Sequence, residues 1–263
     1  MPSAVRTLGV ARSLALYYGI PFRARRLTKF YSQFIRANDL CFDVGAHAGN
    51  RVRCFRRLGA RVVAIEPQRD FFRLLERLYG RDAGVQLVPA AVGRSAGSAT
   101  LLVSDRTPTV TTLSSAWVQQ VRNDPSFAGV EWRSSERVAV TTLAALIDLH
   151  GAPDFVKIDV EGYEAEALGG LATAVRALSF EYLPAARAVA LECIDRLTEL
   201  GDYRYNWSRG ESHRLLEPEW LSPPAMHARL AALAADAGSG DVYARLESAL
   251  PHGAQRAVSR VGP

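Results

Sequence analysis

The feature that most constrains this chain is a regular alternation, from residue 40 onward, of short apolar runs with segments of helical periodicity. In the clearest helical segment, the apolar side chains Phe71, Leu74, Leu75, Leu78 and Tyr79 recur on one face of a helix. Alternating strands and helices form parallel sheets, because each helix crosses one face of the sheet and brings the chain back to the end at which the previous strand began. The pattern therefore predicts an α/β fold, a mostly parallel sheet with helices on both faces.

The apolar runs and their periodicity give approximate bounds for each element. The predicted strands are Leu40–Val44, Arg61–Glu66, Val85–Val92, a short one near Thr100–Ser104, Asp154–Val160, Leu178–Tyr182, and a terminal antiparallel pair, Tyr203–Trp207 and Asp241–Leu246. The predicted helices are Ser13–Tyr18, Arg25–Ile35, Asn50–Leu58, Phe71–Tyr79, Thr142–Leu149, Glu164–Ala177 and Ala185–Leu200. Between residues 104 and 137 we expect a long loop, and loops of this length in compact domains are usually functional or disordered.

Positive charge is concentrated at the N-terminus. Residues 1–38 carry seven basic side chains and no acid, whereas the net charge of the whole chain is +5. The remaining 225 residues therefore sum to −2, which argues against a nucleic-acid partner. We expect residues 1–36 to form a basic helical arm and residues 37–263 to form the main domain. The arm is expected to pack in contact with solvent, or to dock on an acidic partner, substrate or membrane surface; its apolar helix face could serve a homodimer.

Two further patterns bear on the cellular location. No uncharged apolar run approaches the roughly 20 residues that span a bilayer. The cysteines Cys41, Cys54 and Cys193 are odd in number and show no CxxC spacing. This argues against a disulfide framework or a zinc site and predicts a reducing, cytoplasmic environment.

The first strand–turn–helix shows which ligand the sheet could bind. A dinucleotide fold would show GxGxxG here, but this turn carries GxxxG, from Gly45 to Gly49, preceded by Asp43. An acid at this place would repel a pyrophosphate and suit an ammonium group. Glu66, at the end of the second predicted strand, is placed to accept hydrogen bonds from ribose hydroxyls. Together these residues predict an adenosine ligand with a cationic group, as in S-adenosylmethionine, and disfavour an NAD-dependent oxidoreductase.

Each of these two acids also has a purely structural interpretation. Asp43 could bond the amides of the turn, and Glu66 could cap the helix that follows Pro67. The pair, on successive strand ends, favours cofactor binding.

Five sequence motifs resemble the FkbM-type methyltransferases. They are DVGAHAGN, AIEP, VAVTTLAALI, FVKIDVEGYEAEALGG and SFEYLP. The resemblance covers about residues 35–247 and implies a Rossmann-like class I fold with a seven-stranded sheet. It also implies methyl transfer from S-adenosylmethionine, commonly to hydroxyl oxygens of small molecules, sugars and natural products. It places Asp159–Gly162 in a signature loop. The chain departs from the family pattern at His47, where an Asn is usual, and at Ala144, where an Asp is usual.

The predicted cofactor-binding residues are Asp43, Gly45, Ala46, His47, Asn50, Glu66, Pro67, Ala91 and Asp159. His47 could act through its backbone N–H in the turn, or its ring could point toward the substrate.

Carboxylates crowd the end of the fourth predicted long strand. Asp159 and Glu161 are two residues apart and would share a face, and Glu181 ends the next long strand. These three acids, with His47, are the candidate catalytic residues. They could contact ligand or substrate directly, one of them serving as the base; they could hold Mg²⁺, which is not favoured; or they could cap the next helix.

The neighbouring charges are expected to be structural. Glu164 and Glu166 should lie on a solvated helix face, and Lys157 should form a buried ion pair. We expect the loop 104–137 and the segment Asn206–Pro224 to cover the substrate site and to suit a hydrophilic acceptor. The leading hypothesis is an O-methyltransferase of a small molecule, glycan or natural product; the alternatives are an N-methyltransferase and a degenerate fold that acts as a scaffold.

Overall fold

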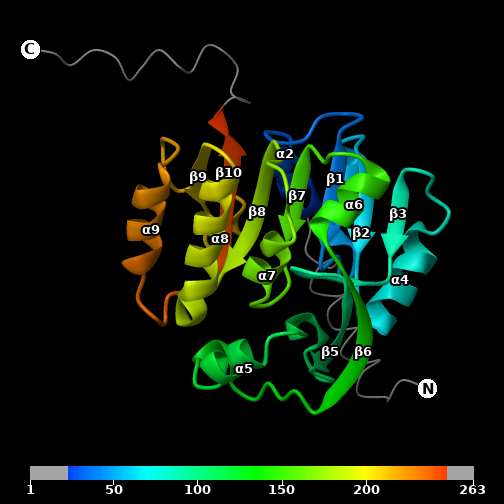
Figure 1. Ribbon diagram of the computed structural model, residues 1–263, viewed down its shortest axis with the longest axis horizontal. Helices are drawn as coiled ribbons and strands as arrows, with labels where there is room; N and C mark the ends of the chain where they lie inside the picture. The colour runs from blue at the N-terminus through cyan, green and yellow to red at the C-terminus, as the bar shows by residue number, and fades with distance from the viewer. Residues whose placement is uncertain (1–22, 248–263) are drawn as a thin grey trace, which may run out of the picture.

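The computed structural model describes residues 23–247 of the chain, and within them the main sheet has seven strands (Figure 1). Its order is β3 (Val85–Val88), β2 (Arg61–Ile65), β1 (Leu40–Val44), β7 (Phe155–Ile158), β8 (Ala177–Tyr182), β10 (Gly240–Leu246) and β9 (Tyr203–Trp207). Strand β10 runs antiparallel to both of its neighbours, and the pairs from β3 to β8 are parallel. The predicted α/β fold with its antiparallel terminal pair is confirmed.

Helices cover both faces of this sheet, because its central strands are apolar on both sides. The helices of the described chain are α2 (Arg23–Tyr31), α3 (Asn50–Arg57), α4 (Arg69–Tyr79), α5 (Ser115–Val121), α6 (Leu143–His150), α7 (Glu164–Gly169), α8 (Arg187–Leu200) and α9 (Pro223–Ala231). Along β1, Leu40, Phe42 and Val44 share a core cluster with α6, α7 and α8, whereas Cys41 packs with α2 and α3. In Figure 1, α6, α7 and α8 lie in front of the sheet and α2 lies behind it. Within residues 23–247 no helix is long and apolar enough to cross a membrane.

Residues 23–36, the described part of the predicted arm, pack against the sheet. The rings of Phe30 and Phe34 both contact Tyr243 of β10, at centroid distances of 5.1 and 5.4 Å. Tyr31 is fully buried and contacts Phe155 of β7 at 5.7 Å. Within residues 23–36, the apolar face that the sequence suggested for a dimer is therefore covered within the same chain, because its aromatic rings fit against the sheet. The predicted helix Ser13–Tyr18 lies outside the described residues.

A second, smaller sheet was not predicted. The strand expected at Val85–Val92 divides at Pro89, and β4 (Ala91–Val92) joins β6 (Ser134–Thr141) and β5 (Gly97–Val103) in the order β4-β6-β5. Figure 1 shows β5, β6 and α5 gathered below the main sheet. Only Val138 and Val140 give β6 an apolar face, so its alternation was too weak to identify. The expected long loop is therefore partly β6 and partly α5.

Helix α7 is shorter than predicted, since it ends at Gly169 instead of continuing to Ala177. A Cβ at Gly170 would overlap the carbonyl oxygen of Gly93, so the two backbones approach as closely as glycine alone permits. The Gly169-Gly170 pair thus ends the helix and allows its C-terminus to pack directly beside the end of β4. Helix α9 was missed because two prolines open it and its apolar face is short.

We expect Phe155→Ala to lower the free energy of unfolding by about 3–5 kcal/mol, since this buried ring would leave a cavity between α2, α3 and β7. Urea denaturation followed by circular dichroism measures the change. Leu149→Ala is the control, because Leu149 is 75% exposed and its removal should change stability by about 0.5 kcal/mol or less. Equal losses in the two variants would contradict this assignment of the core.

Candidate functional site

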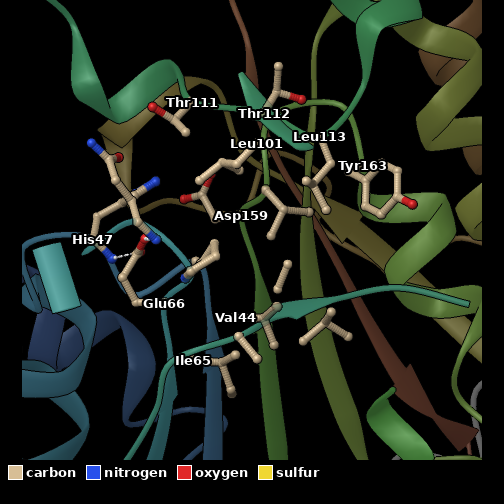
Figure 2. Close-up of a pocket in the computed structure, with 17 residues that line it drawn as sticks. Val44, His47, Ile65, Glu66, Leu101, Thr111, Thr112, Leu113, Asp159 and Tyr163 are labelled. Atoms are coloured by element: carbon tan, nitrogen blue, oxygen red, sulfur yellow. Dashed lines mark hydrogen bonds between the residues drawn. The ribbon is translucent and has the colours of Figure 1, made fainter. Parts of the chain in front are cut away.

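A pocket with an empty volume of about 440 Å³ opens at the carboxyl ends of β1, β2 and β7 (Figure 2). Its floor comes from these strand ends, and the second sheet and the loop between β5 and β6 (residues 104–133, the β5–β6 loop) close it from the other side. The lining residues are Val44, Gly45, His47, Ile65, Glu66, Pro67, Gln68, Ala90, Ala91, Val92, Leu101, Thr111, Thr112, Leu113, Asp159, Val160 and Tyr163. The pocket therefore lies where ligands bind in open α/β sheets.

Glu66 organises one end of the pocket. Its carboxylate accepts a hydrogen bond of 2.8 Å from the backbone N–H of His47 and another of 2.8 Å from the backbone N–H of Gln68. Figure 2 shows the first of these bonds beside the cavity. Glu66 thus fixes two turns, and each of its oxygens retains acceptor capacity. Both sequence-based interpretations of Glu66, ribose acceptor and local cap, are compatible with this geometry.

The turn after β1 depends on backbone conformations that few residues adopt. Gly45 has φ of +81°, and a Cβ there would overlap the carbonyl oxygen of Asp159. His47 has φ of +45°, an uncommon value for a residue with a side chain, and its ring lines the pocket. The close approach of Gly45 to Asp159 brings the ends of β1 and β7 together under the pocket.

The predicted cofactor residues divide into two groups. Gly45, His47, Glu66, Pro67, Ala91 and Asp159 line the pocket. Asp43, Ala46 and Asn50 do not, because Asp43 and Ala46 are buried beneath the turn and the Asn50 side chain accepts a bond from the backbone N–H of Arg51.

Asp43 is a buried carboxylate without a complete set of partners. It is 1% exposed, and its Oδ2 has no hydrogen-bond partner among residues 23–247. The amides of Gly45 and Ala46 donate to the carbonyl of Ile65, so Asp43 does not cap them. Burial raises the pKa of Asp43 to about 6, although Arg51 and Lys157 oppose that rise.

Lys157 forms the buried ion pair that the sequence predicted. Its ammonium, 1% exposed, lies 3.2 Å from Asp159 Oδ2 and 2.8 Å from Asp241 Oδ1 on β10. Burial alone would lower the pKa of Lys157, but the two carboxylates outweigh it and keep the pKa well above its ordinary value. In the same way, burial would raise the pKa of Asp159, but Lys157 holds it below its ordinary value. Asp159 is therefore ionised near neutral pH.

The three candidate catalytic acids meet at the signature loop. Asp159, Glu161 and Glu181 each offer an oxygen, and these oxygens lie within 4.8 Å of one another. Burial, together with the neighbouring carboxylates, raises the pKa of Glu161 and of Glu181 well above the ordinary value. The set could share protons or hold a hard cation through carboxylate oxygens. Among these three acids, only Asp159 lines the 440 Å³ pocket.

Glu164 was wrongly predicted to be solvated. It is 2% exposed and accepts hydrogen bonds from the backbone N–H groups of Val160 and Gly162, so it caps the signature loop. Burial raises the pKa of Glu164 to about 7. Glu166 does lie at the surface, where it pairs with the exposed Arg94.

The β5–β6 loop is docked on the signature loop. Thr112 donates its hydroxyl to the carbonyl of Glu161 at 2.6 Å, and Trp117 packs where a Cβ of Gly162 would otherwise lie. This loop supplies Thr111, Thr112 and Leu113 to the pocket, as expected of a segment that covers the site.

The other segment expected to cover the site, Asn206–Pro224, contributes none of the residues described as lining the pocket. It packs behind the sheet instead, where Glu211 pairs with Arg51 at 3.2 Å and His213 contacts Phe30. The pocket residues that the sequence did not single out include Gln68, Leu101 and Tyr163. Gln68 directly follows the AIEP motif and Tyr163 lies within the motif FVKIDVEGYEAEALGG, whereas nothing in the sequence marked Leu101 as a pocket residue.

The order of the main sheet, the pocket at its carboxyl edge and the Glu66 turn define a Rossmann-like methyltransferase fold. The family model described as "Methyltransferase FkbM domain" matches residues 43–204. The chain therefore belongs to the FkbM methyltransferase family, and by family and fold it is an S-adenosylmethionine-dependent methyltransferase. Among curated protein sequences, none matches this chain.

Solved structures with a similar fold include three methyltransferases. The precorrin-6y C5,15-methyltransferase of Geobacter metallireducens is 11% identical, with 85% of this chain and 87% of that chain covered and a TM-score of 0.42. A TehB-like methyltransferase of Corynebacterium glutamicum is 8% identical, with 90% and 94% covered and a TM-score of 0.45. An O-methyltransferase of Bacillus cereus in complex with SAH is 11% identical, with 92% and 89% covered and a TM-score of 0.44.

We expect the free energy of unfolding of the Asp43→Asn variant, relative to that of the unmodified protein, to increase by about 2 kcal/mol as the pH rises from 4 to 7. The pKa of Asp43 rises from 3.8 to about 6 on folding, so the folded state resists its ionisation and loses stability across that window. Urea denaturation at the two pH values measures the change. Asp148→Asn, which removes an exposed carboxylate, is the control. A gain from Asp43→Asn that is the same at pH 4 and pH 7 would contradict the assignment.

Proposed function

We propose that this protein transfers the methyl group of S-adenosylmethionine to a hydroxyl oxygen of a small molecule, sugar or natural product. The observation that carries the proposal is one pocket with Glu66 at one end and an ionised Asp159 beside it. Glu66 suits the ribose hydroxyls, and the anionic Asp159 suits a cationic ligand and a departing proton.

The residues around Glu66 would hold the cofactor. Pro67 and Ala91 give this end of the pocket apolar walls for an adenine ring, and the buried Gln68 amide, which has no hydrogen-bond partner among residues 23–247, could bond the edge of that ring. Asp43, buried beneath the turn with an unpartnered oxygen, adds negative potential that favours the cofactor's positive groups. The anionic pair Asp43 and Asp159 thus favours a sulfonium ligand over a pyrophosphate, which supports methyl transfer rather than hydride transfer.

Asp159 would act at the reacting end. In an in-line displacement, the acceptor oxygen bonds to the methyl carbon while the carbon–sulfur bond breaks and its electron pair stays on sulfur. The acceptor's hydroxyl proton then passes to the Asp159 carboxylate, which Lys157 keeps ionised until that moment. Glu161 and Glu181, whose pKa values are raised, would be protonated and could donate hydrogen bonds to the acceptor.

We expect Glu66→Gln to weaken binding of S-adenosylhomocysteine about 10- to 100-fold, because the turn amides and the ribose lose a charged acceptor. Isothermal titration calorimetry measures the affinity. Glu76→Gln, on the exposed side of α4, should bind like the unmodified protein, and NADH should give no signal. Failure of the unmodified protein to bind S-adenosylhomocysteine would remove the enzymatic proposal and favour a scaffold role.

We expect Asp159→Asn to lower methyl transfer to a hydroxylated acceptor by about 10²–10⁴-fold while S-adenosylhomocysteine still binds. Release of S-adenosylhomocysteine from a panel of alcohols, amines and sugars measures turnover. Since the base is a carboxylate that Lys157 already holds ionised, EDTA should leave the rate unchanged. Loss of activity in EDTA that Mg²⁺ restores would instead assign the three acids to a metal ion. Turnover with the amines alone would favour N-methylation.

A further inference from the structure

The side chain of Gln68 is buried in the pocket without a hydrogen-bond partner in the described chain. Gln68 is 1% exposed, and neither Nε2 nor Oε1 of its amide bonds to any of residues 23–247. Among the described residues that line the 440 Å³ pocket, it is the one whose buried side-chain polar atoms are unpaired. Because an unpaired buried amide destabilises a fold, this group requires a partner from a ligand or from solvent.

The fold does not use this amide as a structural contact. Gln68 occupies the N-cap position of α4, but its side chain makes no capping bond. Its backbone makes the structural contacts instead. The Gln68 N–H donates to Glu66 at 2.8 Å, and the Gln68 carbonyl accepts from the N–H of Phe72 at 2.9 Å. A fixed backbone therefore holds the amide in the pocket wall, with its donor and its acceptor both left for a ligand.

The position of Gln68 beside Glu66 shows which part of the cofactor it would meet. In a nucleoside, the base is joined to the ribose carbon beside those that carry the hydroxyl groups. Since the backbone of Gln68 is bonded to the carboxylate that would hold those hydroxyls, its side chain lies where the base would begin. Pro67 and Ala91 form apolar walls of the same pocket. The base would thus lie against hydrocarbon with one polar edge facing the amide.

The two threonines of the β5–β6 loop that line the pocket cannot take this role. The Thr111 hydroxyl donates to the carbonyl of Pro108 at 2.8 Å, and the Thr112 hydroxyl donates to the carbonyl of Glu161 at 2.6 Å. Their hydroxyl protons are therefore already engaged. Gln68 is left to offer a donor and an acceptor side by side.

This pair of groups complements adenine. Oε1 of the amide can accept a hydrogen bond from the 6-amino group while Nε2 donates to the ring nitrogen next to it. A purine without the 6-amino group would leave Oε1 buried and unpaired. Apolar walls alone discriminate weakly between bases of similar shape, whereas a buried polar group rejects a ligand that leaves it unpaired.

We propose that Gln68 selects the base of the cofactor, by bonding the 6-amino group of adenine and the adjacent ring nitrogen. This inference rests on the proposed function and adds to it the residue that determines which nucleoside the pocket accepts. Glu66 suits ribose hydroxyls, which every ribonucleoside carries, so it cannot make that choice.

A matched pair of ligands tests the proposal. The full chain is titrated by isothermal calorimetry with S-adenosylhomocysteine and with the analogue in which unsubstituted purine replaces adenine, so that only the 6-amino group differs. We expect S-adenosylhomocysteine to bind about 10- to 100-fold tighter, because the analogue leaves Oε1 without a partner. Equal affinity for the two ligands would overturn the proposal.

The Gln68→Met variant assigns the preference to this residue. Methionine keeps the length of the side chain and removes both polar atoms, so the variant should bind the two ligands with affinities within about 2-fold of each other. Gln86→Met makes the same change at an exposed position of β3 and should keep the full preference. A full preference retained in Gln68→Met would refute the assignment.

The stability of the ligand-free chain distinguishes a ligand-binding amide from a structural one. Replacing an unpaired buried amide by hydrocarbon of similar shape removes a cost. We therefore expect Gln68→Met to melt at the same temperature as the unmodified protein, or higher, in thermal denaturation followed by circular dichroism. A lower melting temperature, or failure to fold, would show that the amide makes a structural contact and would count against the proposal.

The same titrations separate this inference from the proposed function. If the unmodified protein does not bind S-adenosylhomocysteine, methyl transfer itself is contradicted. If it binds S-adenosylhomocysteine and the purine analogue equally, the methyltransferase proposal stands and only the role of Gln68 is lost.

Discussion

One buried ammonium connects the scaffold to the site. Lys157 lies between Asp159, which faces the pocket, and Asp241 of β10. Without this cation, the carboxylates of Asp159, after β7, and Asp241, at the start of β10, would face each other across the end of the sheet with no balancing charge, at a cost of several kcal/mol. With it, Asp159 stays ionised while its neighbours Glu161 and Glu181 are driven toward protonation. A single ion-pair network thereby keeps one of three adjacent carboxyl groups ionised while the pKa values of the other two are raised.

The signature loop then holds these groups together beside the pocket, with Asp159 alone among the three lining it. Glu161 and Gly162 both have positive φ, at 53° and 82°, so the chain turns sharply directly after Asp159. Such conformations are costly for a residue with a side chain and persist where surrounding contacts hold them. Here the contacts are the Glu164 carboxylate, the Thr112 hydroxyl and the Trp117 ring. The turn is thus fixed from both sides, by its own helix and by the β5–β6 loop.

The central sheet, the first turn and the Lys157 ion pair could be predicted from the sequence, because strong apolar alternation and short motifs specify them locally. The second sheet could not, because β6 is polar except for Val138 and Val140. Glu164 was misjudged because helical periodicity places it on an outer face, whereas the amides of a sharply turned loop draw it inward. The sequence marked Trp117 only as a packing residue or an aromatic wall; its contact with Gly162 could not be predicted, since it joins distant segments of the chain.

The place of β10 in the sheet has a consequence for how the chain is made. Strand β9 has no main-sheet neighbour except β10, yet it precedes β10 in the sequence and must wait for it. During synthesis, β9 therefore leaves the ribosome before the strand with which it pairs. It joins the main sheet only when residues 240–246 have been synthesised. The same event delivers Asp241 to Lys157. The charge balance beneath the pocket is thus completed by one of the last described segments of the chain to leave the ribosome.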